Sequence, residues 1–390
     1  MTTSRRSRHP ADTAFDRRGW LVRALAGAAY ASFAAAAGAE PGLATGERGD
    51  RSKPAPPAKP DLLASLLQRN HELRPDFGGG FANHMSMGLY SLSALGADAA
   101  QLERFAEAHW ARLEPLPAEP APAIGAHAWK TRLGQRDAIN GYRALFTQAV
   151  ARHGREATLR QYLPDLLPGI GCAGFHALIR TGYGVRFGDD REIADGLAYW
   201  ATAFVPLGPL GSIGAERDPR ALLESVRATP ALAGRDLPGH LITGKMKAAA
   251  ELPEFQAKVD ALAPDDNTLA ALAATTVRIY ADSDDFTALH AVTGTHAFRL
   301  LQPFIAPPEL GLRYFWQAVL AAYVSVGAPR VVDPPASDVP DWNESLGRAR
   351  ASLDEHKIKL VDVAHEQGAF YADPLYRRAA ARRLGLLRSG

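Results

Sequence analysis

Apolar side chains recur every three or four residues along almost the whole chain after residue 60, and this spacing limits the possible folds more than any other feature. Two of the stripes are Leu159, Tyr162, Leu163 and Leu166, and Ile193, Leu197, Trp200 and Phe204. Such spacing is typical of amphipathic α-helices. Strict alternation is scarce, and no Asn-Gly or Asp-Gly turn separates two alternating runs, so sheets built from hairpins are not expected.

The periodicity predicts a single all-α domain over residues 61–390, with roughly a dozen helices. No internal repeat with a period of roughly 30–50 residues is visible, which disfavours a regular solenoid. We therefore expect an irregular multi-helix domain that encloses a metal- or substrate-binding cavity.

Residues 1–39 have the pattern of an export signal. An arginine-rich start that includes Arg17 and Arg18 precedes an alanine-rich apolar run, which ends in Ala37-Gly38-Ala39. Paired arginines ahead of a mild apolar segment resemble a twin-arginine signal, and small residues at this place are typical of a cleavage site. We expect the twin-arginine machinery to export the chain to the periplasm or beyond, with cleavage near Ala39. An ordinary secretory signal and an uncleaved anchor are the alternatives.

The composition of the remaining chain excludes some classes of binding partner. Residues 40–60 are rich in Gly and Pro and predict a linker. The formal net charge is +2, and residues 1–39 carry six Arg and two Asp, which leaves 2 − 4 = −2 for the rest. This gives no basic surface for nucleic acid, and we expect no stable membrane insertion after removal of the signal.

The single cysteine, Cys172, excludes an internal disulfide and a metal cluster held by thiolates of this chain alone. A metal would need nitrogen and oxygen ligands, which the twelve histidines can supply.

Gly169-Ile170-Gly171-Cys172-Ala173-Gly174 matches the dinucleotide-binding pattern G-x-G-x-x-G. That pattern is meaningful only after a buried strand. Here the preceding residues have helical spacing and include Pro164 and Pro168. A proline directly before the first glycine is unsuited to a central parallel strand. The segment therefore predicts a glycine-rich turn between two helices.

Four histidines occur in apolar, helix-patterned surroundings, namely His84, His176, His290 and His356, and His296 is a second choice beside His290. A lone buried histidine is more often a core residue than a ligand. Four of them would need four sets of hydrogen-bond partners, so their convergence on a metal is the simpler interpretation. We expect His71, His109, His127, His153 and His240 to be surface or capping residues.

The spacing of residues along a helix distinguishes two of these histidines and draws attention to a nearby lysine. His290 and His296 are six residues apart, about 240° around one helix, so only one of them is expected at the metal unless the helix breaks at Gly294. Lys359 is three residues from His356, on the same helix face, and lies in an apolar run. The chain has eight lysines against 36 arginines. A buried lysine is unfavourable unless it is neutralised or modified, and a lysine whose amine reaches solvent is the alternative.

Several of these segments resemble the questin oxidase-like family. The resemblance includes Asn83-His84-Met85-Ser86-Met87-Gly88-Leu89, His176-Ala177-Leu178-Ile179-Arg180-Thr181-Gly182-Tyr183-Gly184, Leu289-His290-Ala291-Val292-Thr293 and His356-Lys357-Ile358-Lys359-Leu360-Val361. They follow in order through most of residues 61–390.

The resemblance implies an all-α oxygenase, a mono- or dioxygenase that opens a ring of an anthraquinone-like aromatic polyketide with dioxygen in a Baeyer–Villiger-like reaction. It implies non-haem Fe(II) held by His84, His176, His290 and His356 with a carboxylated Lys359, and it leaves NADPH possible as a cofactor. No catalytic residue beyond the metal ligands is expected.

Two other functions stay open at this point. The same histidine and lysine-carbamate set could hold zinc in a metal-dependent hydrolase, which iron or zinc content would distinguish. The chain could also be a non-catalytic helical ligand-binding protein with core histidines. The motifs H-E-x-x-H and G-x-S-x-G are absent from the sequence.

Overall fold

The computed structural model describes residues 59–119, 122–333 and 339–387. The predicted export signal, and the predicted linker except for its last two residues, lie outside the described residues. The first described helix begins at Lys59, two residues before the predicted start of the domain. The division into signal, linker and domain therefore stays a prediction.

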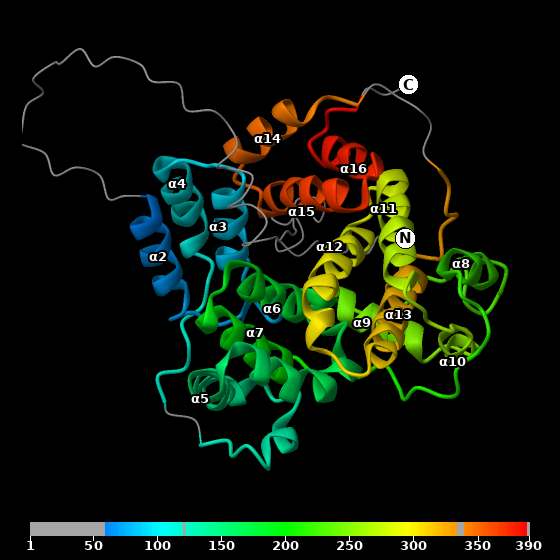
Figure 1. Cartoon of the computed structure of the whole chain (residues 1–390), viewed down its shortest axis with the longest axis horizontal. Coiled ribbons are helices and arrows are strands. Elements are labelled where there is room, and N and C mark those ends of the chain that lie inside the picture. Colours follow the sequence, from blue (N-terminus) through cyan, green and yellow to red (C-terminus); the bar gives the residue numbers. More distant parts are fainter. Residues whose placement is uncertain (1–58, 120–121, 334–338, 388–390) are drawn as a thin grey trace, which may run out of the picture.

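Helices make up nearly all regular structure in the described part of the chain (Figure 1). The α-helices are α2 (Lys59–Asn70), α3 (Met85–Ala94), α4 (Ala99–Trp110), α5 (Ile139–Leu166), α6 (His176–Phe187), α7 (Asp190–Thr202), α8 (Pro219–Arg227), α9 (Ile242–Ala250), α10 (Phe255–Asp260), α11 (Thr268–Ser283), α12 (Phe286–Leu301), α13 (Pro308–Ser325), α14 (Trp342–Ala351), α15 (Glu355–Tyr371) and α16 (Leu375–Arg383). Short 3₁₀ turns connect several of them. The two strands, β1 (Asp76–Phe77) and β2 (Phe81–Ala82), form one antiparallel hairpin. The prediction of an all-α fold is confirmed.

Aspartates begin many of these helices. The side chains of Asp98, Asp189, Asp218, Asp285, Asp341 and Asp354 each accept a hydrogen bond from a backbone N–H in the first turn of the helix that follows. A carboxylate at this position satisfies backbone donors that have no partner within the helix. The same charge is also favoured by the positive end of the helix dipole.

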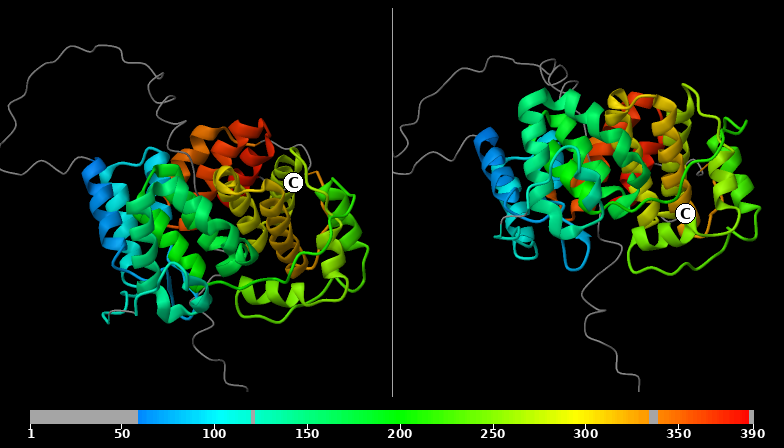
Figure 2. Two further views of the ribbon diagram at one scale, coloured as in Figure 1. Left: turned by 60° about the horizontal axis from the view of Figure 1, so that its bottom comes forward. Right: turned by 90° about the horizontal axis from the view of Figure 1, so that it is seen from below.

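Four helices from distant parts of the sequence form the centre of the domain (Figures 1 and 2). α3 packs against α6, α6 against α12, α12 against α15, and α15 against α3. Several other helices pack on this ring from outside, with α7 on α6, α11 and α13 on α12, and α16 on α15. Each central helix therefore has one side facing the other three.

Two glycines let α6 and α7 approach closely. A Cβ atom added at Gly184 would lie 2.5 Å from the backbone nitrogen of Ile193, and one added at Gly196 would lie 2.6 Å from Oγ1 of Thr181. Side chains at either position would push the helices apart. This contact allows side chains of α7 to reach the central helix α6.

The glycine-rich segment 169–174 lies on 3₁₀ turns between α5 and α6, with no strand before it. Ala173 and Phe175 have left-handed backbone φ angles of 48° and 68°. Non-glycine residues adopt this conformation only at an energetic cost, and such residues often occur near functional sites. The prediction of a turn is confirmed, and the turn ends directly at His176.

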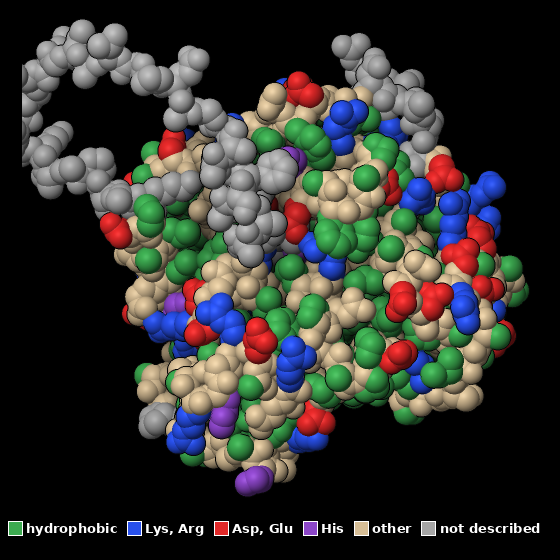
Figure 3. Space-filling view, in the orientation of Figure 1, with side chains coloured by type: hydrophobic (Ala, Val, Ile, Leu, Met, Phe, Trp, Pro, Cys, Tyr) green, Lys and Arg blue, Asp and Glu red, His purple; other side chains and the backbone are tan. Residues whose placement is uncertain are grey.

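The surface of the described residues mixes both signs of charge. On the face drawn in Figure 3, Lys and Arg side chains alternate with Asp and Glu side chains. Among the helices of the described residues, none combines the length and the apolar character that a membrane crossing requires.

Candidate metal centre

The four predicted histidines meet inside the ring of central helices. The ring centroids of His84 and His176 are 4.8 Å apart, those of His176 and His290 are 4.8 Å apart, and those of His84 and His356 are 5.2 Å apart. Three of these side chains come from the N-terminal ends of their helices, because His84 is the N-cap of α3, His176 is the first residue of α6, and His356 is the second residue of α15. His290 lies in the second turn of α12. All four are buried.

Lys359 joins the imidazoles from the next turn of α15. Its side chain is fully buried, and Nζ lies 2.6 Å from Nδ1 of His84 and 3.6 Å from Sδ of Met87. The prediction that this lysine is buried near His356 is confirmed, and the alternative of an amine that reaches solvent is excluded. We call His84, His176, His290, His356 and Lys359 the histidine cluster.

Three imidazoles in this cluster are held through Nδ1. His176 donates to the backbone carbonyl of Ala173, His290 donates to that of Phe286 at 2.7 Å, and His356 donates to the carboxylate of Asp354 at 3.1 Å. A neutral imidazole that donates through Nδ1 presents the lone pair of Nε2. Among the described residues, Nε2 of His176 and Nε2 of His290 have no hydrogen-bond partner.

Burial keeps these imidazoles neutral. It lowers the pKa of His176 to about 3, with the nearby charge of Lys359 adding to the decrease. Burial also lowers the pKa values of His84, His290 and His356 well below the usual range, and the neighbouring lysine and histidines add to it. Neutral imidazole is the form that binds a metal ion. Buried nitrogens without partners and neighbouring carbonyl or carboxylate acceptors are both typical of metal-binding histidines.

Two acidic residues lie beside the cluster at the start of α15, and one of them, Asp354, binds a member of it. Asp354 binds His356 and also accepts the backbone N–H groups that begin the helix. Glu355 accepts hydrogen bonds from His109 at 2.9 Å and from Arg112 at 2.6 Å. Burial alone would raise the pKa of Glu355, but these two partners outweigh it and lower the pKa. Sequence reasoning missed Asp354, although a helix-capping aspartate two residues before a candidate ligand was a usable signal.

His296, the second choice, lies elsewhere. α12 continues through Gly294 without a break, so His290 and His296 point to different sides of it. Nε2 of His296 is 3.9 Å from Oε1 of Glu366, whereas His290 contacts His176. The placement therefore favours His290 over His296 as a member of the candidate site.

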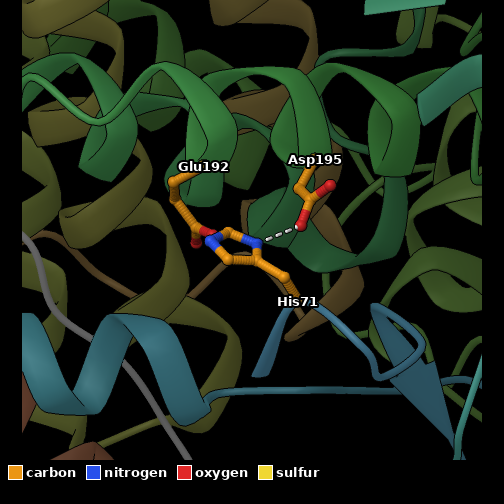
Figure 4. A group of neighbouring side chains, drawn as sticks. All are labelled: His71, Glu192 and Asp195. Atoms are coloured by element: carbon orange, nitrogen blue, oxygen red, sulfur yellow. Dashed lines mark hydrogen bonds and ion pairs between the residues drawn. The ribbon is translucent and has the colours of Figure 1, made fainter. Parts of the chain in front are cut away.

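A second group of metal-type side chains lies on α7 and directly after the end of α2 (Figure 4). Ligand atoms of His71, Glu192 and Asp195 all lie within 4.8 Å of one another. However, Nδ1 of His71 lies 2.6 Å from Oδ2 of Asp195, as drawn in Figure 4, and Arg180 binds both oxygens of Glu192 at 2.9 Å. Arg143 binds the other oxygen of Asp195 at 2.6 Å.

This second group is an internal ion-pair network. Burial would raise the pKa of Asp195, but the hydrogen bond from His71 and the charges of Arg180 and Arg143 lower it. Two guanidinium groups beside these carboxylates also disfavour a metal cation. We call His71, Arg143, Arg180, Glu192 and Asp195 the carboxylate cluster.

The prediction from the sequence was wrong for two other histidines. His71 and His109, expected at the surface or at helix caps, are both buried and bind carboxylates of distant helices. Their partners follow 124 and 246 residues later, so local sequence carried no sign of the contacts. His127, His153 and His240 are exposed as predicted.

Comparisons with known proteins agree with this arrangement. The model of the family described as Questin oxidase-like matches residues 81–363, a range that contains every residue of the histidine cluster. The chain is also similar to a protein named Baeyer-Villiger monooxygenase AacuH from Aspergillus aculeatus, with 28% identity over 160 residues. That match spans 37% of this chain and 33% of the relative. Because the family model covers most of the chain, the protein belongs to the questin oxidase-like family.

Proposed function

We propose that this protein is an oxidoreductase, an oxygenase that uses dioxygen to oxidise or open a ring of an aromatic, polyketide-like substrate. Its family and the name of its monooxygenase relative support this class of reaction. An anthraquinone-like substrate and a Baeyer–Villiger-like ring opening are the most specific forms of the proposal. A reduced nicotinamide, NADPH, is the proposed source of electrons.

The proposed cofactor is Fe(II), held by the histidine cluster. The observation that carries this assignment is the pair of buried Nε2 atoms on His176 and His290, which lack partners among the described residues while Nδ1 of each ring is bound. Imidazole and carboxylate-type ligands suit non-haem iron, and bound ferrous iron would supply the activation of dioxygen. The chain's own part is to hold the imidazoles neutral, to orient the substrate and to exclude water.

A carbamate on Lys359 fits the same site. The N-terminal ends of α3, α6 and α15 carry partial positive charge and converge here. An ammonium group is unfavourable in such a place, whereas an anion is favoured. Addition of carbon dioxide to the neutral amine releases one proton and gives a carboxylate-type oxygen ligand. The carbamate therefore replaces an unfavourable cation with a favoured anion.

Metal analysis and dioxygen uptake test the proposal together. The purified protein, loaded anaerobically with Fe(II), is expected to hold stoichiometric iron and to consume dioxygen with 1,8-dihydroxyanthraquinone and NADPH. His176→Ala and His290→Ala should weaken iron binding by more than about 100-fold, since even loss of a group that supports a ligand costs up to about that much. His296→Ala is the matched control on α12, and it should retain iron.

Other outcomes would contradict the assignment. Stoichiometric zinc with hydrolytic activity would favour the hydrolase, and loss of metal in His296→Ala but not in His290→Ala would exchange the two histidines. A protein that binds neither metal and consumes no dioxygen would be better described as a non-catalytic binding protein.

We also propose export through the twin-arginine route, on the sequence of residues 1–39. The mature protein should begin at Glu40, and replacement of Arg17 and Arg18 by lysine should leave the precursor in the cytoplasm. Mass spectrometry of the mature chain and cell fractionation give the two readouts. A mature chain that still contains residue 1 would contradict the cleavage site.

A further inference from the structure

The thioether of Met87 on α3 touches the histidine cluster without belonging to it. Its Sδ atom lies 3.6 Å from Nζ of Lys359, and the same Nζ lies 2.6 Å from Nδ1 of His84. The side chain of Met87 is fully buried. The carbamate proposed for Lys359 keeps this nitrogen as its linking atom, so the sulfur lies beside a proposed ligand of the metal.

The packing of α3 holds the sulfur at this place. His84 and Met87 are three residues apart, so they lie next to each other on one face of the helix start. A Cβ atom added at Gly88 would lie 2.2 Å from Cζ of Phe105, which shows how closely α3 and α4 are packed. α3 also packs against α15, the helix that carries Lys359. Close packing against both neighbours leaves the sulfur little freedom to move away from the cluster.

The chain contains two matched methionines for comparison. Met85, Met87 and Met246 lie within the described residues, and all three are buried. Met85 is two residues before Met87, which is about 200° around the axis of α3, so it faces another side of the helix. Met246 lies on α9 and its methyl group packs against Gly171. Solvent exposure therefore does not distinguish the three sulfur atoms, whereas contact with the histidine cluster does.

We propose that Met87 is an oxidation site of this enzyme, which accepts an oxygen atom when no substrate is present to take it. The inference rests on the proposed oxygenase function, which brings dioxygen and electrons to the histidine cluster. A thioether is oxidised readily to methionine sulfoxide. Because Sδ of Met87 lies beside the candidate metal centre, it competes with the substrate for the activated oxygen.

The oxidation uses only reactants of the proposed function. The O–O bond of dioxygen breaks, one oxygen atom forms a bond to Sδ, and the other leaves as water. Dioxygen gains four electrons, two from the sulfur and two from the hydride of a reduced nicotinamide. The hydride and one proton from solvent supply the two hydrogens of the water. Methionine is thereby oxidised to its sulfoxide, and NADPH is oxidised to NADP⁺.

The modification acts back on the site. Methionine sulfoxide is polar and carries an additional oxygen atom, whereas the space around Met87 is closely packed. A buried polar oxygen needs a hydrogen-bond donor, and Nζ of Lys359 is already in contact with the sulfur. The sulfoxide therefore disturbs the lysine that is proposed to carry a ligand. We expect the oxidised enzyme to bind iron less tightly and to lose activity, so that turnover without substrate limits itself.

Peptide mass spectrometry of the wild-type protein tests the proposal with a readout other than activity. Protein loaded with Fe(II) is incubated with dioxygen and NADPH, with and without 1,8-dihydroxyanthraquinone, and metal-free protein is treated in parallel. Without the anthraquinone, a gain of about 16 Da at Met87 should exceed that at Met85 and Met246 on the order of 10-fold, because oxygen is activated beside one sulfur only. Fragment ions separate Met85 from Met87. Metal-free protein should show no such preference, and the anthraquinone should protect Met87.

Two variants add a second measurement. Met87→Leu nearly keeps the apolar volume but removes the sulfur, so it should slow the loss of activity during incubation without substrate. Met85→Leu is the matched control on α3 and should lose activity at the wild-type rate. Dioxygen uptake with no sulfoxide at Met87, or with equal sulfoxide at all three methionines, overturns the oxidation site alone. A wild-type protein that binds no iron and consumes no dioxygen overturns the proposed function as well, so the two failures are distinguishable.

Discussion

The histidine cluster and the carboxylate cluster lie one helical turn apart, yet they satisfy their polar atoms in opposite ways. On α6, His176 belongs to the first and Arg180 to the second. Arg180 binds both oxygens of Glu192 and also contacts Asp195. Nε2 of His176, in contrast, has no partner among the described residues. The carboxylate cluster is internally balanced, whereas the histidine cluster leaves lone pairs available.

This difference is the reason to propose the histidine cluster, and not the carboxylate cluster, as the candidate metal site. Residue type and proximity alone mark two trios, Asp354, Glu355 and His356 and also His71, Glu192 and Asp195, because the ligand atoms of each trio lie within 4.8 Å of one another. The hydrogen bonds of the second trio and the neighbouring arginines already compensate its buried charges. A metal ion would have to displace those partners. Unused acceptors are therefore a better guide to ligands than the distance between candidate residues.

The largest expected change is a loss of unfolding free energy when one charged member of the carboxylate cluster is removed. Glu192→Ala leaves the guanidinium of Arg180 buried with only part of its compensation, and loss of one partner of a buried pair costs about 3–5 kcal/mol of unfolding free energy. Chemical denaturation measures this loss, and the folded fraction should still bind iron at the histidine cluster.

Glu344→Ala provides the control for that experiment. Glu344 forms an exposed ion pair with Arg348 on α14, and such pairs contribute about 0–1 kcal/mol. If the wild type binds a second divalent ion that Glu192→Ala alone loses, the carboxylate cluster is a metal site and the comparison fails.

A smaller effect is expected when the support of one histidine is weakened. Asp354→Asn removes the negative charge that holds His356 through Nδ1, while asparagine preserves the helix cap. Loss of such a supporting carboxylate weakens metal binding by about 10–100-fold. Competition against a chelator measures the change, with Asp341→Asn, the exposed cap of α14, as the matched variant. Equal affinities in both variants would mean that Asp354 acts only as a cap.

The sequence predicted the elements of the candidate site better than its surroundings. Helical periodicity predicted the all-α fold, because the apolar positions within each amphipathic helix indicate which face is buried. The same patterns drew attention to His84, His176, His290, His356 and Lys359, which do converge. The spacing of His290 and His296 correctly separated them on α12.

The residues around the candidate site make contacts with distant residues, which no local sequence pattern indicates. His71, directly after α2, and Asp195, on α7, are 124 residues apart and meet only in the folded chain. His109 and Glu355 are 246 residues apart. The expected enclosed cavity stays a prediction, as do the ligand roles and the export route.

The smallest expected effect is on the pH dependence of the unfolding free energy, which should differ between the two clusters. The pKa values of the cluster histidines are lowered from 6.5 in the folded protein, so the unfolded chain binds protons there before the folded protein does. Stability therefore falls as the pH decreases below about 6.5, by about 1.4 kcal/mol per pH unit for each such histidine.

The carboxylate cluster responds in another range, because the lowered pKa of Asp195 preserves its contribution until the pH falls below about 3.8. In metal-free protein, His290→Gln should remove about 1 kcal/mol of the stability difference between about pH 6.5 and about pH 5.5, because the full slope of about 1.4 kcal/mol per pH unit applies only well below the unfolded pKa. Denaturation curves at the two pH values measure it. If the variant and the wild type lose stability equally over this range, His290 is already protonated in the folded protein, and the contrast between an unsatisfied and a balanced cluster does not hold at that residue.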